Sequence, residues 1–165
     1  MKKNIRVVVC PPQEEAYIAE IPNEYNYLRK IVDGPIECVY PFMDKGNGFG
    51  IGLVCNEEAK LRGKPLSREI RFEGTDYRDI IAGTFLIVGL TRENFGSLSP
   101  AQAEKYRQMF LNPEIFIRTE HTIIAVPVSA SIRDEVEKIK AERPASAVNE
   151  QIKYAPRDMK PFRKG

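Results

Sequence analysis

The chain has 165 residues, of which 42% are hydrophobic and 29% are charged. This is the composition of a folded domain, because disordered chains are poorer in apolar and aromatic residues. The net charge is only +2, which excludes an acidic nucleic-acid mimic and disfavours a protein that coats nucleic acid. The length is that of one domain. The residue pattern places this domain at 1–130 and predicts a C-terminal helix and a basic, proline-containing tail over 131–165.

The first forty residues predict two strands, a helix and a third strand. Residues 5–10 are β-branched and predict a strand, and residues 15–21 predict its hairpin partner. A helix follows, with Asn23 expected as its N-cap residue. Gly34 is expected to take the left-handed conformation that ends this helix, and residues 36–40 predict the next strand.

A glycine-rich segment follows, with glycines at alternate positions of 46–52. It does not match the dinucleotide-binding fingerprint, because the third required glycine falls on Ile51 or Leu53. Two interpretations remain. The segment is either a flexible hairpin connection or a mobile flap over a ligand, with Phe42 and Phe49 as its apolar contacts.

The middle of the chain predicts strands separated by a polar stretch. Residues 51–55 indicate a strand, whereas residues 56–68 are polar and rich in turn signals. Residues 79–89 form the most apolar stretch and predict one central strand that is buried on both faces. Its interior Gly83 indicates a bulge or a close approach of another backbone.

The start of a second helix has a strong local signal. Ser99 is placed as the N-cap, Pro100 as the first helical residue and Gln102 as the third, which is the pattern of a capping box. The apolar spacing extends this helix to about Phe110.

The remaining pattern completes the predicted fold class. Residues 115–117 and 122–128 indicate a strand pair, and Ser131 is placed to cap a third helix. This order predicts an α+β fold with a mixed sheet, about three helices and a short irregular C-terminal tail. Its opening strand–strand–helix–strand order resembles the β-grasp arrangement.

Catalytic and metal-binding patterns are weak. The single histidine, His121, is placed in a turn between two strands, where an exposed turn histidine is expected. Glu57 and Glu58 are adjacent, so on a strand they would point to opposite faces and would not form an acid–base pair. No metal-ligand spacing is found in the sequence. We therefore expect no enzyme activity, no cofactor and no metal.

The cysteines and the hydropathy favour a cytoplasmic location. The longest apolar run, residues 80–90, is about half the length of a membrane span. The cysteines are odd in number and lie in or at the ends of apolar runs, so we expect buried, reduced thiols: Cys10, Cys38 and Cys55.

Three stretches together resemble a known family. They are GPIECVYP at 34–41, VCNEEAKLRGKPLSR at 54–68 and DIIAGTFLIVG at 79–89, extended by residues 95–99. They are similar to the uncharacterised domain of unknown function 3846, whose members are small proteins of phages and conjugative elements. The resemblance covers roughly residues 4–110, and the chain departs from it at Ala59, where glycine is expected.

The resemblance implies a genomic setting and no catalytic residues. Small accessory proteins of phages often act against host defence, so we expect a non-enzymatic protein that sequesters a nucleotide-derived defence signal. Such a site needs aromatic faces for a base and polar groups for phosphates. The candidate ligand-binding residues are Tyr40, Phe42, Phe49, Asn56, Arg68, Thr84 and Phe85.

Two other functions remain open. The protein could be a protein–protein inhibitor or an assembly module that acts on a host defence protein, and a homo-oligomer is compatible with this and with sequestration. It could also be an accessory factor of nucleic acid that uses its basic tail, although the low net charge disfavours this. No membrane partner is expected.

Overall fold

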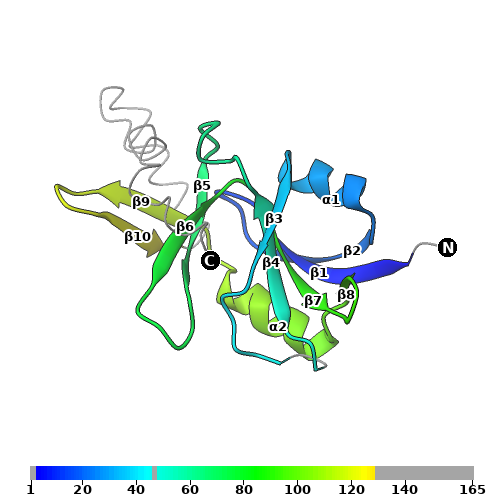
Figure 1. Cartoon of the computed structure of the whole chain (residues 1–165). Coiled ribbons are helices and arrows are strands. Elements are labelled where there is room, and N and C mark those ends of the chain that lie inside the picture. The colour runs from blue at the N-terminus through cyan, green and yellow to red at the C-terminus, as the bar shows by residue number, and fades with distance from the viewer. Residues whose placement is uncertain (1–2, 46–47, 129–165) are drawn as a thin grey trace.

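The computed structural model describes residues 3–45 and 48–128 of the chain (Figure 1). These residues form two helices and ten strands, which confirms the α+β class. In chain order the elements are β1 (Asn4–Cys10), β2 (Tyr17–Pro22), α1 (Tyr25–Val32), β3 (Ile36–Val39), β4 (Ile51–Asn56), β5 (Leu66–Arg71), β6 (Arg78–Ala82), β7 (Phe85–Leu90), β8 (Phe95–Gly96), α2 (Pro100–Met109), β9 (Glu114–Arg118) and β10 (Ile123–Pro127).

The main sheet has the strand order β2-β1-β7-β4-β3, and the short β8 pairs with the end of β7. The opening order of two strands, a helix and a strand is observed as predicted. The expected mixed sheet is wrong for the described residues, because every strand pairing among them is antiparallel. β3 follows α1 to the edge opposite β2 and pairs there with β4.

The two helices cover opposite faces of this sheet (Figure 1). The strand alternation of β1 causes this, since successive side chains point to opposite faces. Val7 and Val9 belong to the apolar cluster of α1, whereas Val8 and Cys10 belong to the cluster of α2. All four side chains are at most 3% exposed, so β1 is central to both cores.

The ends of α1 differ from the prediction. Glu24, not Asn23, is the N-cap residue, and it makes no side-chain capping bond. The Asn23 amide instead donates to the Phe95 carbonyl, 2.9 Å away, and so joins the helix start to β8. At the other end Asp33, rather than Gly34, takes the left-handed conformation, with a φ of 63°.

The start of α2 is as predicted. The Ser99 hydroxyl accepts from the Gln102 backbone N–H at 3.1 Å, and the Gln102 side chain accepts from the Ser99 N–H at 2.9 Å. This reciprocal pair is a complete capping box.

The long apolar stretch over residues 79–89 is two strands, not one. β6 and β7 lie in different sheets, and Gly83 turns the chain between them with a φ of +78° that disfavours other residues. β6 pairs with β5, a strand that the polar residues 56–68 did not indicate. Ile70 of β5 and Ile81 of β6 pack into the same core cluster as α2.

The hairpin β9–β10 lies against the other face of β5–β6. Its strands confirm the predicted strand pair, and Phe116 and Ala125 on its inner face pack with Ile80 and Leu66. In Figure 1 this hairpin extends away from the main sheet. The predicted third helix and the tail lie outside the described residues.

Candidate functional site

Arg68, a candidate ligand contact, is fully buried. Its guanidinium donates to the carbonyl oxygens of Phe110, Pro11 and Glu14 at 3.0, 3.0 and 2.7 Å. Burial lowers the pKa of this group. Arg68 therefore joins β5 to the end of α2 and to the β1–β2 turn, and it cannot reach a phosphate at the surface without unfolding this region.

Asn56 is also a structural residue. Its amide nitrogen donates to the carbonyls of Val32 and Asp33 at 3.2 and 2.9 Å, and its side-chain oxygen accepts from the Glu58 N–H at 2.8 Å. The side chain lies so close to Gly34 that a Cβ there would come within 2.5 Å of it. Gly34 is thus required by the packing of Asn56 and not by its own backbone angles.

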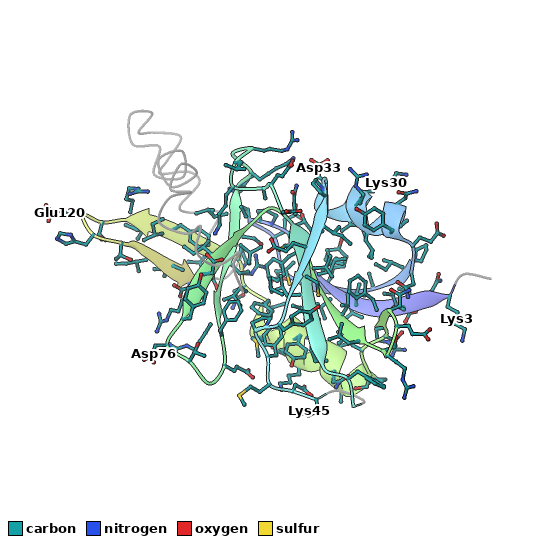
Figure 2. The ribbon with its side chains drawn as sticks, viewed as in Figure 1. Lys3, Lys30, Asp33, Lys45, Asp76 and Glu120 are labelled. Carbon is teal, nitrogen blue, oxygen red and sulfur yellow. The ribbon has the colours of Figure 1, made fainter. Side chains whose placement is uncertain are left out.

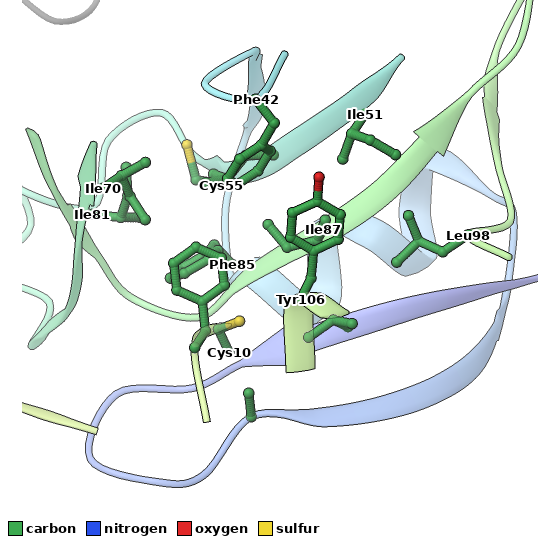
Figure 3. Close-up of a cluster of buried hydrophobic side chains, with 14 of the residues drawn as sticks. Cys10, Phe42, Ile51, Cys55, Ile70, Ile81, Phe85, Ile87, Leu98 and Tyr106 are labelled. Atoms are coloured by element: carbon green, nitrogen blue, oxygen red, sulfur yellow. The ribbon is translucent and has the colours of Figure 1, made fainter. Parts of the chain in front are cut away.

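Phe42 and Phe85 belong to the main core (Figure 3). The ring of Phe42 lies 4.8 Å from that of Tyr106, and the ring of Phe85 lies 5.5 Å from that of Phe110. Phe42 is therefore a core residue. Thr84, the residue before β7, is partly buried.

Tyr40 and Phe49 are the two candidates with exposed rings, at 61% and 51%. The negative charge of the neighbouring Cys38 in its thiolate form, a hydrogen bond with Cys38 and burial all raise the pKa of Tyr40. Because four of the seven candidate residues are buried, the structure does not bring the candidates together around one ligand site. Whether the glycine-rich segment is a flap stays a prediction, since residues 46–47 lie outside the description.

A hollow of about 630 Å³ lies elsewhere, between β6 and β10, and is here called the β6–β10 groove. Glu69, Tyr77 and Arg78 line it from the β5–β6 hairpin, and His121 and Ile123 line it from the β9–β10 hairpin. Figure 2 labels Asp76 and Glu120, which lie at the turns of these two hairpins. The volume is within the range of small-molecule sites.

The polar groups of the groove include both signs of charge. Arg78 Nη1 lies 3.7 Å from Glu69 Oε1, and the Arg78 side chain is 50% exposed. Tyr77 is 39% exposed, and its ring packs against that of Phe72 with 5.3 Å between the centroids. Burial and the charge of Asp79 raise the pKa of Tyr77 to about 12, so this phenol is neutral at physiological pH.

Asp79 also lines the groove, and its carboxylate is held in a buried ion pair with Lys60. Its Oδ1 atom accepts from Lys60 Nζ at 2.8 Å and from the Ile80 N–H at 2.8 Å. Lys60 and Asp79 come from two of the three stretches that carry the family resemblance, residues 54–68 and 79–89. Those stretches therefore meet as packing partners at the junction of the main sheet and β5–β6.

His121 is an exposed turn residue, as the sequence predicts. Its Nε2 atom lies 3.1 Å from a Glu120 carboxylate oxygen, and its side chain is 85% exposed. Because it lines the rim of the groove, His121 can contact a bound molecule. The described parts of the chain contain no group of three or more histidine, cysteine or acidic residues able to hold a metal ion.

Tyr77 and Arg78, which line the groove, were not among the residues predicted from the sequence. The available signal was their position, directly after the turn at residues 74–76 and at the start of an apolar strand. An aromatic and a basic residue at the end of a buried strand lie near the surface, where a ligand can reach them.

The comparisons with known proteins place the chain in a family without an assigned activity. No helix in the described part of the chain has the length and hydropathy needed to cross a membrane. No curated protein and no solved structure matches the chain. The family model described as domain of unknown function (DUF3846) matches residues 5–111, from β1 to the end of α2, and leaves β9–β10 outside the match. Since this match covers more than half of the chain, the protein belongs to the DUF3846 family.

Proposed function

We propose that the protein is a stoichiometric, non-catalytic binding protein that sequesters a small nucleotide-like molecule in the β6–β10 groove. The observation that carries the proposal is the groove itself, a concave surface of about 630 Å³ that two exposed residues, Tyr77 and Arg78, line on one wall. In the phage or mobile-element setting that the resemblance implies, the ligand would be a nucleotide-derived defence signal in the bacterial cytoplasm.

The chemistry of the groove supports this ligand class. The Tyr77 ring offers a face for stacking a base, and Ile123 extends the apolar surface on the opposite wall. Stacking of one base on one aromatic ring contributes roughly 1–3 kcal/mol. Arg78 offers paired N–H donors that suit a phosphate.

The first experiment asks whether a ligand is taken up intact. The purified protein is incubated in turn with a cyclic dinucleotide, a linear dinucleotide and a nucleoside diphosphate. Free ligand is removed by gel filtration, and the protein is then heated. Release of unmodified ligand at about one molecule per binding site supports sequestration. Repeated conversion to a cleaved product would make the protein an enzyme. No uptake, together with co-purification of a host protein, would favour a protein–protein inhibitor.

The second experiment locates the site. Tyr77→Leu keeps an apolar side chain against Phe72 but removes the aromatic face, so affinity should fall roughly 5- to 150-fold. Tyr25→Leu is the matched control, because Tyr25 is a 57% exposed tyrosine on α1 and does not line the groove. Equal affinity of the two variants would contradict the assignment of the groove.

A further inference from the structure

Two arginines stand directly opposite each other on the β5–β6 hairpin. The strand register pairs Arg71 with Arg78, and two positions earlier it pairs Glu69 with Ile80. Side chains two residues apart on a strand share a face, so Arg71 and Glu69 lie on one face, together with their cross-strand partners. Glu69 and Arg78 line the β6–β10 groove, which places Arg71 on the groove side of the hairpin.

This arrangement is unfavourable without a bound anion. Like charges that are directly opposite in an antiparallel pair destabilise it, because their Cβ atoms are only about 5 Å apart. Both arginines are exposed, and Arg78 contacts Glu69 at 3.7 Å. One carboxylate can neutralise only one guanidinium, so the arginine pair and Glu69 together leave an excess positive charge at the end of the groove.

We infer that Arg71 and Arg78 form the phosphate-binding end of the groove. The inference rests on the proposed function and adds to it the orientation and class of the ligand: a phosphorylated molecule with its phosphate between the two guanidiniums and its ring toward Tyr77. A phosphate is negatively charged, so it neutralises the positive charge that Glu69 leaves, and its oxygens accept N–H bonds from both guanidiniums. A neutral nucleoside would leave the repulsion in place.

The test compares ligands that differ only in phosphate. Dissociation constants for ADP and adenosine are measured by calorimetry for the wild-type protein, Arg71→Gln and Arg78→Gln. We expect each substitution to weaken ADP binding roughly 10- to 150-fold, the range for hydrogen bonds to a charged group, and to leave adenosine binding unchanged. Arg92→Gln is the control, since Arg92 is an exposed arginine in the β7–β8 turn. Arg71→Lys keeps the charge but loses the paired donors, and should give an intermediate loss.

A second readout separates this inference from the proposed function. Pyrophosphate alone should raise the unfolding temperature of the wild-type protein, and this rise should be absent in both glutamine variants. If ADP binding is weakened by Tyr77→Leu but not by either arginine substitution, the phosphate site is wrong and the binding function stands. If pyrophosphate gives an arginine-dependent rise while no nucleotide binds, the anion site stands and the nucleotide function is wrong. If neither effect is observed, both are overturned.

Discussion

Arg68 is fully buried, and its guanidinium lies among main-chain carbonyl oxygens. Its planar set of donors suits a phosphate, and its position in a polar stretch indicated a surface residue. In the structure the same donors bind main-chain carbonyls from two distant segments. A buried cation is favourable only when its donors are satisfied, and here the carbonyls take the role that a phosphate was expected to have.

Glu114, at the start of β9, is a titratable residue that links stability to pH. Burial raises the pKa of Glu114 to about 7. The hydrogen bond from the Glu69 backbone N–H and the charge of Arg68 act in the opposite direction, and the Glu69 carboxylate adds to the increase. The Glu69 N–H donates to Glu114 Oε1 at 2.8 Å and thereby connects β5 to β9. Because the pKa is raised in the folded state, the folded protein binds the proton more tightly than the unfolded chain does.

We therefore predict that Glu114→Gln stabilises the protein at alkaline pH. The contribution of Glu114 to the free energy of unfolding should decrease as pH rises from about 4.5 to about 7, and the loss should be complete above that range. The difference between the two pKa values corresponds to at most roughly 3 kcal/mol. Glutamine cannot ionise, and its oxygen can still accept from Glu69. Urea unfolding at pH 5 and pH 8 should show a gain for the variant only at pH 8.

Glu104→Gln provides a control with the opposite sign. Glu104 is exposed, and hydrogen bonds from Arg107 and Gln108 lower its pKa to about 2. Its substitution should give no gain at pH 8. A gain of equal size in both variants would indicate a general effect of net charge and would contradict the role assigned to Glu114.

At the scale of elements, those helices and strands were predictable whose stabilising contacts lie close together in the sequence. The start of α2 was predictable because Ser99 and Gln102 bond to each other within one helical turn. The division of residues 79–89 was not, because both halves are apolar and buried and only Gly83 marks the turn. β5 was missed because its sequence is polar, and Arg68 is buried through contacts that lie more than forty positions away.

The position of the candidate site could not be predicted from the sequence, because the contacts that form it are not local. Asn56, a candidate from one of the family stretches, is a buried packing residue. The groove is formed by two hairpins about forty residues apart in the chain, and no local pattern connects them. Its ligand class could be proposed from residue types, whereas its position required the tertiary structure.

The capping box gives a prediction for α2. Ser99→Ala removes the acceptor of the Gln102 N–H and should lower the free energy of unfolding by about 1 kcal/mol. Ser99→Asp retains an acceptor at the same position and adds a negative charge at the positive end of the helix, so it should stay close to the wild type. Chemical denaturation at neutral pH measures both. If the alanine variant unfolds at the same denaturant concentration as the aspartate variant, the cap contributes nothing to stability.

At the scale of the molecule, the structure is a series of packed layers. α1, the main sheet, the layer of α2 and β5–β6, and finally β9–β10 follow one another, with an apolar cluster at each junction. The family match ends before β9–β10, so a chain limited to the matched region would form only one wall of the β6–β10 groove. The binding proposal therefore concerns this chain with its hairpin and does not extend to the matched region alone.

The layering also predicts how the three free thiols react. Cys10 and Cys55 are buried in the α2 cluster, and burial raises the pKa of Cys10 to about 12. Cys38 is partly buried on the edge strand β3, and burial raises its pKa to about 11.

Denatured, unreduced protein should react with three equivalents of a thiol reagent. Native protein should react slowly at Cys38, and Cys10 and Cys55 should be modified together at the rate of global opening, because they share one core. In Cys38→Ser the slow native reaction should disappear and two equivalents should remain on denaturation. Independent modification of Cys10 and Cys55 in the native protein would mean that the core opens in parts, and fewer than three equivalents in the denatured wild type would indicate a disulfide.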